Sequence, residues 1–220
     1  GGRGAMRRGV EWVTVGGVHN AGVCVRGWVG GDRRDYVEGW KGFQKDLRQP
    51  ADRKGDGLDY YRVSTAVLRT HEAKAFPGGI IASLSIPWGS SKGDGDPGGY
   101  HMVWVRDLVE VTGGLLAAGA SREAQRVLRY LFVTQKADGS WPQNMWVRGE
   151  GHWHGRQMDE SAFPILVTAT ALRENLIDQA ELKRLWPMVR KALCFIVQHG
   201  AATDEDRGEE IGGYSAYTIA

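Results

Sequence analysis

Arg106 and Asp107 are the first residues of this sequence whose types and spacing could do chemistry, and they end an aromatic segment, Tyr100–Asp107. A guanidinium and a carboxylate side by side can make paired hydrogen bonds to neighbouring hydroxyl groups, while a flat ring stacks on a pyranose face. One interpretation is therefore a sugar-binding clamp. The alternative is structural: Asp107 caps the helix that begins here, and Arg106 pairs with it.

A second group lies at Trp153–Glu160, where the acidic pair Asp159 and Glu160 precedes a helical pattern. Acidic side chains at a helix start interact favourably with the helix dipole, so this pair by itself indicates an ordinary helix N-terminus. His152 and His154 flank Trp153, but two histidines without a third His or a Cys nearby are not typical of a metal site. We predict neither a metal nor another cofactor.

The third group is Asp204–Glu210, which crowds acidic side chains in front of a further helical pattern. One interpretation is a solvated acidic loop. In the other, neighbouring carboxylates repel one another and raise the pKa of one of them, as a general acid that stays protonated near neutral pH requires. The residues alone leave both interpretations open.

Helical periodicity surrounds the three groups. Apolar residues recur at helical spacing in Tyr36–Leu47, Leu58–Lys74, Val105–Ala118, Arg122–Thr134, Ser161–Asn175 and Asp178–His199. In the second of these, we expect Leu58, Tyr61, Thr65 and Leu68 to share a face.

Short polar residues and glycines predict where several of these helices begin and end. Gly119 should end the third helix, and Ser121 should be the N-cap of the fourth. Asp178 and Glu181 occupy capping-box positions, and Gly200 should close the last helix. The apolar face expected for that helix comprises Leu182, Leu185, Trp186, Val189, Leu193 and Ile196.

Long loops separate the helical segments. Glycines and prolines exclude a helix from 76–100 and leave one strand-like run, Ile80–Ile86, while the loop 139–155 carries Trp141, Trp146 and Trp153. No alternation supports a parallel sheet, so we predict an all-α fold of packed helices with a site built from loops at one end. Residues 1–33 are expected to be a linker or the end of an upstream segment, and residues 34–220 the helical domain.

Composition excludes several classes of function. The net charge of +2 arises from 28 basic and 26 acidic residues that are interspersed, which is unlike a nucleic-acid-binding stripe. No apolar run is long enough for a membrane span, and no signal peptide can be identified. Cys24 and Cys194 lie in apolar surroundings, which favours buried thiols over a disulfide.

Several blocks in this order resemble glycoside hydrolase family 15, the glucoamylase family, and most of all its prokaryotic branch, which includes glucodextranases. The resemblance runs from about Leu58 to Ala220. Its blocks are Leu58–Ser64, Phe76–Ser83, Pro87–Gly89, Gly99–Asp107, Asp138–Met145, Trp153–Glu160 and Glu209–Ser215. It implies an (α/α)6 toroid of six helical hairpins with the substrate pocket at one end, of which the helical segments above would form about half.

The resemblance also implies roles for single residues. Arg106 and Asp107 match the pair that grips the non-reducing glucose, and Glu209 matches the general acid. The further residues that match substrate-binding positions are Tyr100, Trp104, Trp153, Asp206 and Glu210.

Two departures from the family pattern bear on activity. The family usually has Trp before the Glu–Glu pair, where this chain has Gly208. The family's general base is a glutamate in the C-terminal part of the toroid, and no residue of this chain matches it. We therefore expect the 220 residues to be inactive alone, because inversion requires both carboxyl groups.

The predicted function is release of β-D-glucose from the non-reducing ends of starch-like or dextran-like α-glucans by an inverting mechanism. The localisation cannot be deduced, although such a function favours a secreted protein. The linkage, α-1,4, α-1,6 or trehalose, depends on loops beyond the glucose-gripping residues, and the oligomeric state cannot be deduced. A different class stays open: a non-catalytic, carbohydrate-binding helical domain, which Gly208 favours. A terpene cyclase is excluded because the chain has no Asp-rich metal motif.

Overall fold

The computed structural model describes residues 30–49, 59–84, 101–153 and 157–200. The chain divides into two compact units, Gly1–Lys45 and Asp46–Ala220, and each is described by itself. Helices dominate the described ranges, which confirms the all-α prediction: α1 (Gly30–Asp46), α2 (Tyr60–Thr70), α3 (Val105–Ala117), α4 (Ser121–Thr134), α5 (Met158–Arg173) and α6 (Gln179–His199). No helix in the described part is long and apolar enough to cross a membrane.

Helix α1 belongs almost entirely to the first unit and begins at Gly30 rather than at the predicted Tyr36. Its aromatic residues lie one turn apart. Tyr36 meets Trp40 edge-on with ring centroids 6.3 Å apart, and Trp40 meets Phe43 in the same way at 6.0 Å. The predicted domain division at residues 33 and 34 stays a prediction.

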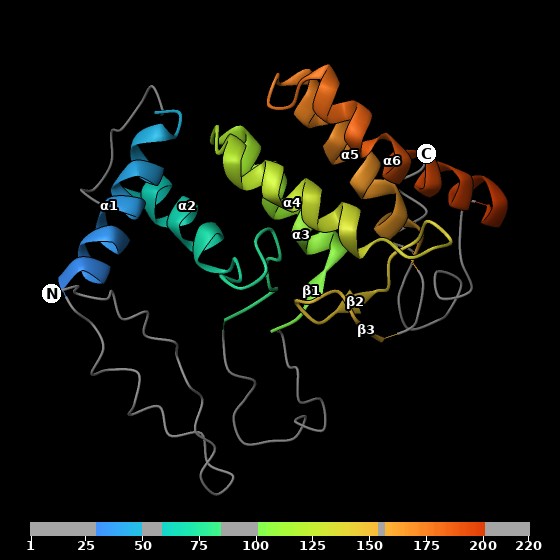
Figure 1. The fold of residues 1–220 in the computed structure, drawn as a ribbon, viewed down its shortest axis with the longest axis horizontal. Coiled ribbons are helices and arrows are strands. Elements are labelled where there is room, and N and C mark those ends of the chain that lie inside the picture. The colour runs from blue at the N-terminus through green and yellow to red at the C-terminus, as the bar shows by residue number, and fades with distance from the viewer. Residues whose placement is uncertain (1–29, 50–58, 85–100, 154–156, 201–220) are drawn as a thin grey trace, which may run out of the picture. The chain divides into compact units, whose positions relative to one another are not determined.

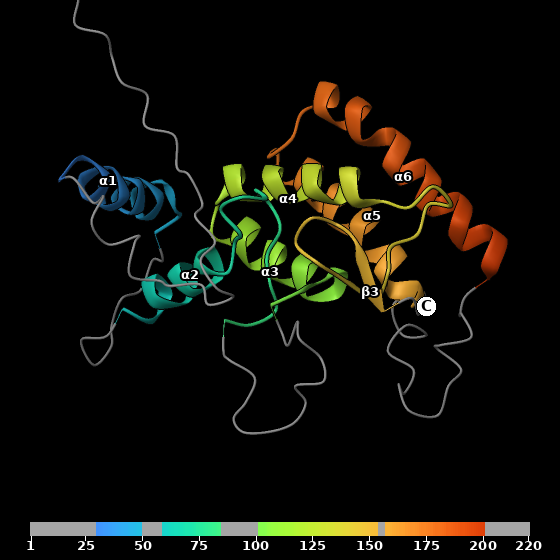
Figure 2. The same cartoon turned by 60° about the horizontal axis from the view of Figure 1, so that its bottom comes forward.

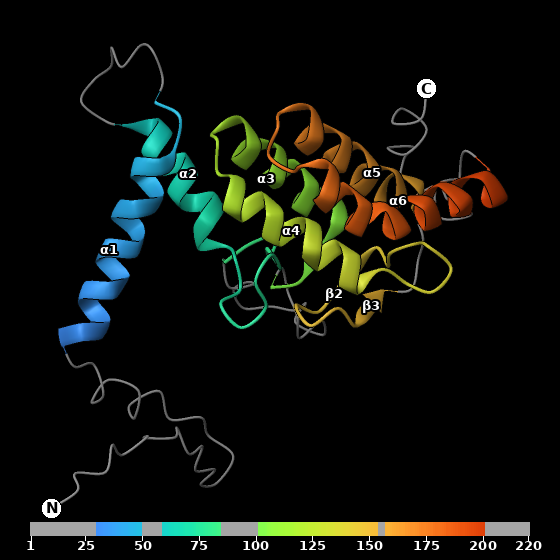
Figure 3. The ribbon, with the colours of Figure 1, turned by 45° about the horizontal axis from the view of Figure 1, so that its top comes forward.

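Two helical hairpins form the core of the second unit. Helix α3 packs on α4, α5 packs on α6, and the hairpins meet where α3 contacts α5 (Figures 1 and 3). Helix α4 buries one stripe that includes Ala124, Val127 and Leu131, as an amphipathic helix does when one side faces solvent. Helix α5 buries its whole first turn and residues further along, so it lies inside the unit.

The turn between α3 and α4 shows why one cap prediction is wrong. Gly119, at φ +79°, ends α3 as predicted, and the N–H of Ala120 bonds to the carbonyl of Leu115 at 2.8 Å. Because this closing turn leads directly into α4, Ala120 is the N-cap and Ser121 is already the first helical residue. The cap of α6 is as predicted: Asp178 Oδ1 accepts the N–H of Glu181 at 2.7 Å, and Gly200 follows the last turn.

The buried face of α6 differs from the predicted one. Leu185 and Val189 are buried as expected, but Trp186 is 51% and Leu193 is 42% exposed, so these two assignments are wrong. The residues that the structure buries are Leu185, Met188, Val189, Ala192 and Phe195. Cys194 is exposed and free, which corrects the prediction of a buried thiol, and Cys24 lies outside the described residues.

A small antiparallel sheet lies beside the start of α3 (Figure 2). Its strands are β1 (Val103–Trp104), β2 (Asn144–Met145) and β3 (Gly151–Trp153), in that order. These strands are too short to show alternation, so the sequence did not predict them. The predicted run Ile80–Ile86 forms no strand in its described part, where Ile80 makes only an isolated bridge to Glu72.

The loops between the elements supply part of the core. Trp141, from the tryptophan-rich loop, is fully buried, and its Nε1 donates to the carbonyl of Leu131 at 3.1 Å. Met102 and Val103, just before α3, are also fully buried. Buried side chains therefore anchor the chain shortly before β2 and directly before α3. The second of these anchors holds the start of α3 in place.

Candidate functional site

The N-terminus of α3 depends on α5 for its cap. Trp104 is the N-cap residue, with extended backbone angles of φ −95° and ψ 134°, and its side chain makes no capping bond. The first N–H groups of a helix need acceptors from outside the helix. Glu160 supplies one, because its Oε2 accepts the backbone N–H of Arg106 at 3.1 Å. A carboxyl group of α5 thus caps α3 through the N–H of a residue 54 positions earlier in the chain.

The guanidinium of Arg106 lies against the same turn of α5. Its Nε donates to Oδ2 of Asp159 at 2.5 Å, and its Nη2 donates to Oε1 of Gln157 at 2.8 Å. Asp159 is 1% and Gln157 2% exposed, whereas the Arg106 side chain keeps 25% of its surface exposed. Two details of the structural alternative are corrected: Trp104, not Asp107, is the N-cap residue, and Arg106 makes its ion pair with Asp159.

The sequence of α5 explains how its first turn presents these groups. Gln157 is the N-cap residue, but its side chain makes no capping bond and reaches Arg106 instead. Asp159 Oδ1 accepts the N–H of Glu160 at 2.9 Å, which leaves Oδ2 for Arg106. Each carboxylate oxygen of Asp159 therefore has a donor, and the acidic first turn also suits the positive end of the helix dipole.

Glu160 is the most unusual titratable group of this cluster. It is fully buried, and its Oε1 has no hydrogen-bond partner among the described residues, with Arg106 Nη2 at 3.9 Å. Burial raises the pKa of Glu160 well above its usual value, and the charge of Asp159 raises it further, while Arg106 acts in the opposite direction. Burial and the carboxylate of Asp159 therefore both favour the protonated form of Glu160, and the guanidinium of Arg106 opposes them.

Arg106 keeps its charge in these surroundings. Burial lowers its pKa, but the hydrogen bond and charge of Asp159, with smaller contributions from Glu160 and Asp107, raise it above its ordinary value. Asp159 and Arg106 thus form a charged pair at the meeting point of two helix N-termini. Such a pair, satisfied by hydrogen bonds on both sides, is rigid.

Asp107 differs from its neighbours because it is exposed, in the first turn of α3. The surrounding protein removes part of its hydration and raises its pKa, against the lowering effects of its own backbone N–H and of Arg106. An exposed carboxylate next to a fixed guanidinium can accept hydrogen bonds from ligand hydroxyl groups. This is the arrangement that the clamp interpretation requires.

The structure describes only some of the predicted site residues. Trp104 lies at the end of β1 and pairs with Asn144 of β2, which on its other side pairs with Trp153 of β3. The small sheet therefore connects the backbones of two predicted pocket residues to the start of α3. Tyr100, Asp206, Glu209 and Glu210, as well as Gly208 and His154, lie outside the described residues.

Sequence reasoning missed the partners of Arg106. Asp159 and Glu160 do begin a helix, as predicted, but they are buried around a guanidinium rather than exposed at a surface. A signal existed, since Gln157, Asp159 and Glu160 stand together in the second group of the sequence. His152 packs its ring edge-on against Trp146 at 5.4 Å, and the described residues contain no cluster of three possible metal ligands.

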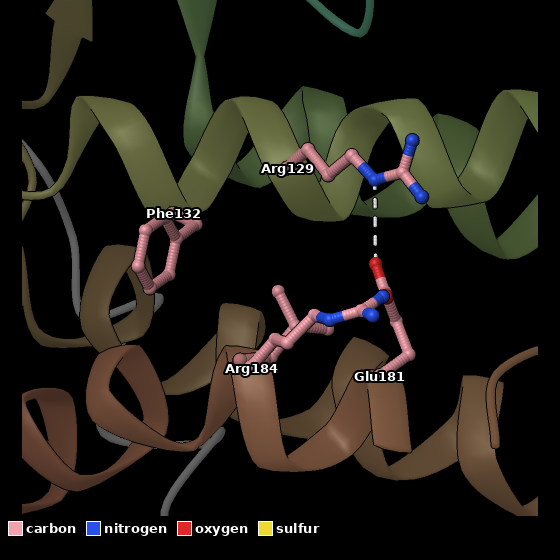
Figure 4. A pocket seen from close by; sticks show the side chains of 5 residues that line it. Arg129, Phe132, Glu181 and Arg184 are labelled. Atoms are coloured by element: carbon pink, nitrogen blue, oxygen red, sulfur yellow. Dashed lines mark hydrogen bonds and ion pairs between the residues drawn. The ribbon is translucent and has the colours of Figure 1, made fainter. Parts of the chain in front are cut away.

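A pocket of about 250 Å³ lies away from this cluster, between α4 and α6 (Figure 4). Arg129 Nε and Arg184 Nη1 both donate to the carboxylate of Glu181, at 3.3 and 2.7 Å, and Phe132 and Leu185 complete the lining. Glu181 lies in the first turn of α6, at the other end of its hairpin from the first turn of α5. The pocket contains none of the predicted site residues.

Comparisons with known proteins give a consistent result. The family model described as glycosyl hydrolases family 15 matches residues 55–140 and 135–220. A glucoamylase from Clostridium sp. (strain G0005) is 39% identical over 185 residues, which are 84% of this chain and 25% of that protein. The crystal structure of a bacterial glucoamylase complexed with acarbose is similar with a TM-score of 0.64 and 34% identity, over 81% of this chain and 25% of that one. The chain thus spans about a quarter of the length of both relatives.

Proposed function

We infer the function of this chain from its family, because the chain belongs to glycosyl hydrolase family 15. Its helical hairpins are part of the (α/α)6 type of fold that the resemblance implied, given the similarity to a bacterial glucoamylase. We propose that the protein acts on starch-like or dextran-like α-glucans and releases glucose from their non-reducing ends. The observation that carries this proposal is the acarbose complex of the solved relative, together with the Arg106 and Asp107 arrangement at the start of α3.

The proposed glucose-binding group consists of Arg106 and Asp107, with Tyr100, Trp104 and Trp153 as aromatic neighbours. Support comes from the different states of the two charged residues. Arg106 is fixed by α5, whereas Asp107 is exposed in the first turn of α3. A fixed donor next to an accessible acceptor matches the alternating donor and acceptor needs of adjacent sugar hydroxyl groups.

The proposed chemistry is inverting hydrolysis. Glu209 protonates the glycosidic oxygen, and Asp206 and Glu210 act as carboxylates around the substrate. In such a mechanism a second carboxylate activates water on the opposite face of the sugar, about 6.5–9.5 Å from the acid. No residue of this chain is assigned that second role, so we propose that the 220 residues bind substrate without turning it over.

Calorimetric titration with acarbose tests the binding group. Replacing Asp107 with alanine should weaken binding by about 1.5–3 kcal/mol, the typical effect of losing hydrogen bonds to a charged group. Because Asp107 is exposed, this change should leave the fold intact.

Glu110→Ala is the matched control, since Glu110 is another exposed carboxylate of the same helix, one turn further along. It should leave the affinity unchanged. Equal affinity of the wild type and the Asp107 variant would exclude the proposed role of Asp107.

A further inference from the structure

The first turn of α5 holds Arg106 at two separate points. Glu160 accepts the backbone N–H of Arg106, while Asp159 and Gln157 accept two different nitrogens of its guanidinium. Main chain and side chain are therefore both anchored to one turn of another helix. All three acceptor residues are at most 2% exposed.

We propose that Gln157, Asp159 and Glu160 are positioning residues that orient Arg106 for binding a sugar, an inference that rests on the function proposed above. They act through Arg106 and need no contact with the ligand. Their role is to fix the guanidinium plane before the ligand arrives.

The geometry supports orientation rather than charge balance alone. A single acceptor would leave the guanidinium free to rotate about the bond to that acceptor. The bond from Nε to Asp159 and the bond from Nη2 to Gln157 together define the plane of the group. An arginine side chain has several rotatable bonds, and ordering them before binding removes that entropic cost from the binding step.

Gln157 gives the most specific indication. A residue at an N-cap position ordinarily uses its side chain to bond to the N–H groups of the first turn. The side chain of Gln157 makes no such bond and bonds instead to Arg106. Its amide carries no charge, so the contribution of Gln157 to this cluster is directional.

A purely structural role predicts something different. In that case the three residues would serve to fasten α5 to α3, and their replacement would alter stability without a specific effect through Arg106. The two roles are separated by asking whether the effect of a Gln157 variant disappears once Arg106 itself is changed.

The experiment is calorimetric titration of the 220-residue chain with acarbose, using Gln157→Met, Arg106→Lys and the double variant. Gln157→Met keeps the side-chain length, removes the acceptor and takes away no capping bond. We expect Gln157→Met to weaken acarbose binding on the order of tenfold in the wild type and to have no further effect when Arg106→Lys is also present.

The control is Glu181→Gln, which weakens ion pairs in the first turn of another helix and should leave affinity unchanged. An equal loss in both Arg106 backgrounds, or no loss in either, would overturn the proposal.

A second measurement needs no ligand and therefore separates this proposal from the proposed function. Nitrogen-15 NMR should show slow exchange with water for the Arg106 Nε–H, compared with the largely exposed Arg184. Gln157→Met and Asp159→Ala should both accelerate that exchange. If wild-type chain does not bind acarbose, the proposed function fails, and this exchange measurement alone decides whether Arg106 is held. Unchanged exchange in both variants would overturn the positioning role.

Discussion

Among single residues, Glu160 is fully buried and lies near charges of both signs. The carboxylate of Asp159 raises its pKa, and the guanidinium of Arg106 lowers it. Glu160 shares the space between α3 and α5 with Asp159, Arg106 and the nearby Asp107. Its Oε2 accepts a backbone N–H, but its Oε1 has no hydrogen-bond donor among the described residues. A neutral carboxylic acid tolerates this environment better than a carboxylate, because an unpaired buried charge costs more than an unpaired neutral group.

This environment predicts a pH dependence of stability. The pKa of Glu160 is about 4.5 in the unfolded chain and is raised in the folded one. Between the two values the folded state binds more protons, so the free energy of unfolding decreases as the pH rises. The stability linked to protonated Glu160 is fully present below pH 4.5 and is lost as the pH rises through the folded-state pKa.

Glu160→Gln removes this proton and keeps an acceptor for Arg106. Urea unfolding at a series of pH values should show the variant gaining stability relative to the wild type as the pH rises, by up to about 1.4 kcal/mol per pH unit. Asp107 titrates in both proteins, so its effect cancels in the difference. Parallel stability curves for the two proteins would show that the pKa of Glu160 is the same in the folded and unfolded chain.

The sequence predicted part of this cluster and missed the rest for a physical reason. Arg106 and Asp107 were predicted to bind sugar because a guanidinium, a carboxylate and aromatic rings together are typical of sugar binding, and that role stays a prediction. The contacts of Asp159 and Glu160 with Arg106 were not predicted, because an acidic pair at a helix start is usually exposed. Their burial follows from packing between segments more than 50 residues apart, which periodicity does not encode.

At the scale of elements, the segment 71–83 is fastened to α4 by an ion pair. Arg126 donates from Nε and Nη2 to the two oxygens of Glu72, each at 2.6 Å, and its Nη2 also reaches Glu123 at 3.1 Å. Glu72 Oε1 in addition accepts the N–H of Gly78 at 2.8 Å. The same segment bonds to the chain just before β1, through Ala82 N–H and Met102 carbonyl at 3.0 Å. It thus connects α4 to the entry of α3.

Gly78 allows this close approach, and its replacement tests it. Its φ is +88°, and a Cβ there would lie 2.2 Å from the carbonyl oxygen of Arg126. Gly78→Ala should lower the free energy of unfolding by about 1–2 kcal/mol from the backbone conformation, with a further loss from the clash. Gly113→Ala is the control, because its Cβ would meet nothing within 4 Å in the middle of α3. The control should stabilise by about 0.5–1 kcal/mol. Equal effects in urea unfolding would contradict the close packing of this segment.

The predictability of the elements follows their length and amphipathicity. The helix ends were predicted to within four residues, except for the start of α1, because each predicted segment carries apolar residues at helical spacing over several turns. The strands β1, β2 and β3 are two or three residues long, and their pairing depends on where the helices place them. The face of α6 was partly wrong because apolar side chains lie on most sides of this helix. Packing on α5 selects the stripe with Met188 and Phe195 and leaves Trp186 at the surface.

At the scale of the whole molecule, this chain spans 25% of the length of each compared relative. The clamp residues that the structure describes belong to α3, and the turn that holds Arg106 belongs to α5. The contacts that we propose between a sugar and these two residues therefore involve an element of this chain. Hydrolysis requires in addition a proton acceptor for the attacking water, which the family resemblance places beyond the residues matched here.

Glu209 therefore provides the test that separates an enzyme from a binding domain. Without a base on the far side of the anomeric carbon, water has no proton acceptor, so the 220 residues should hydrolyse maltooligosaccharides no faster than their Glu209→Gln variant. When the chain is continued to the length of its relatives, the same comparison should show activity that depends on Glu209. Proton NMR during early turnover should then detect β-glucose as the first product, because attack from the opposite face inverts the anomeric centre. Appearance of α-glucose first would exclude inversion, and a folded, full-length protein that binds acarbose but releases no glucose would identify a carbohydrate-binding module instead.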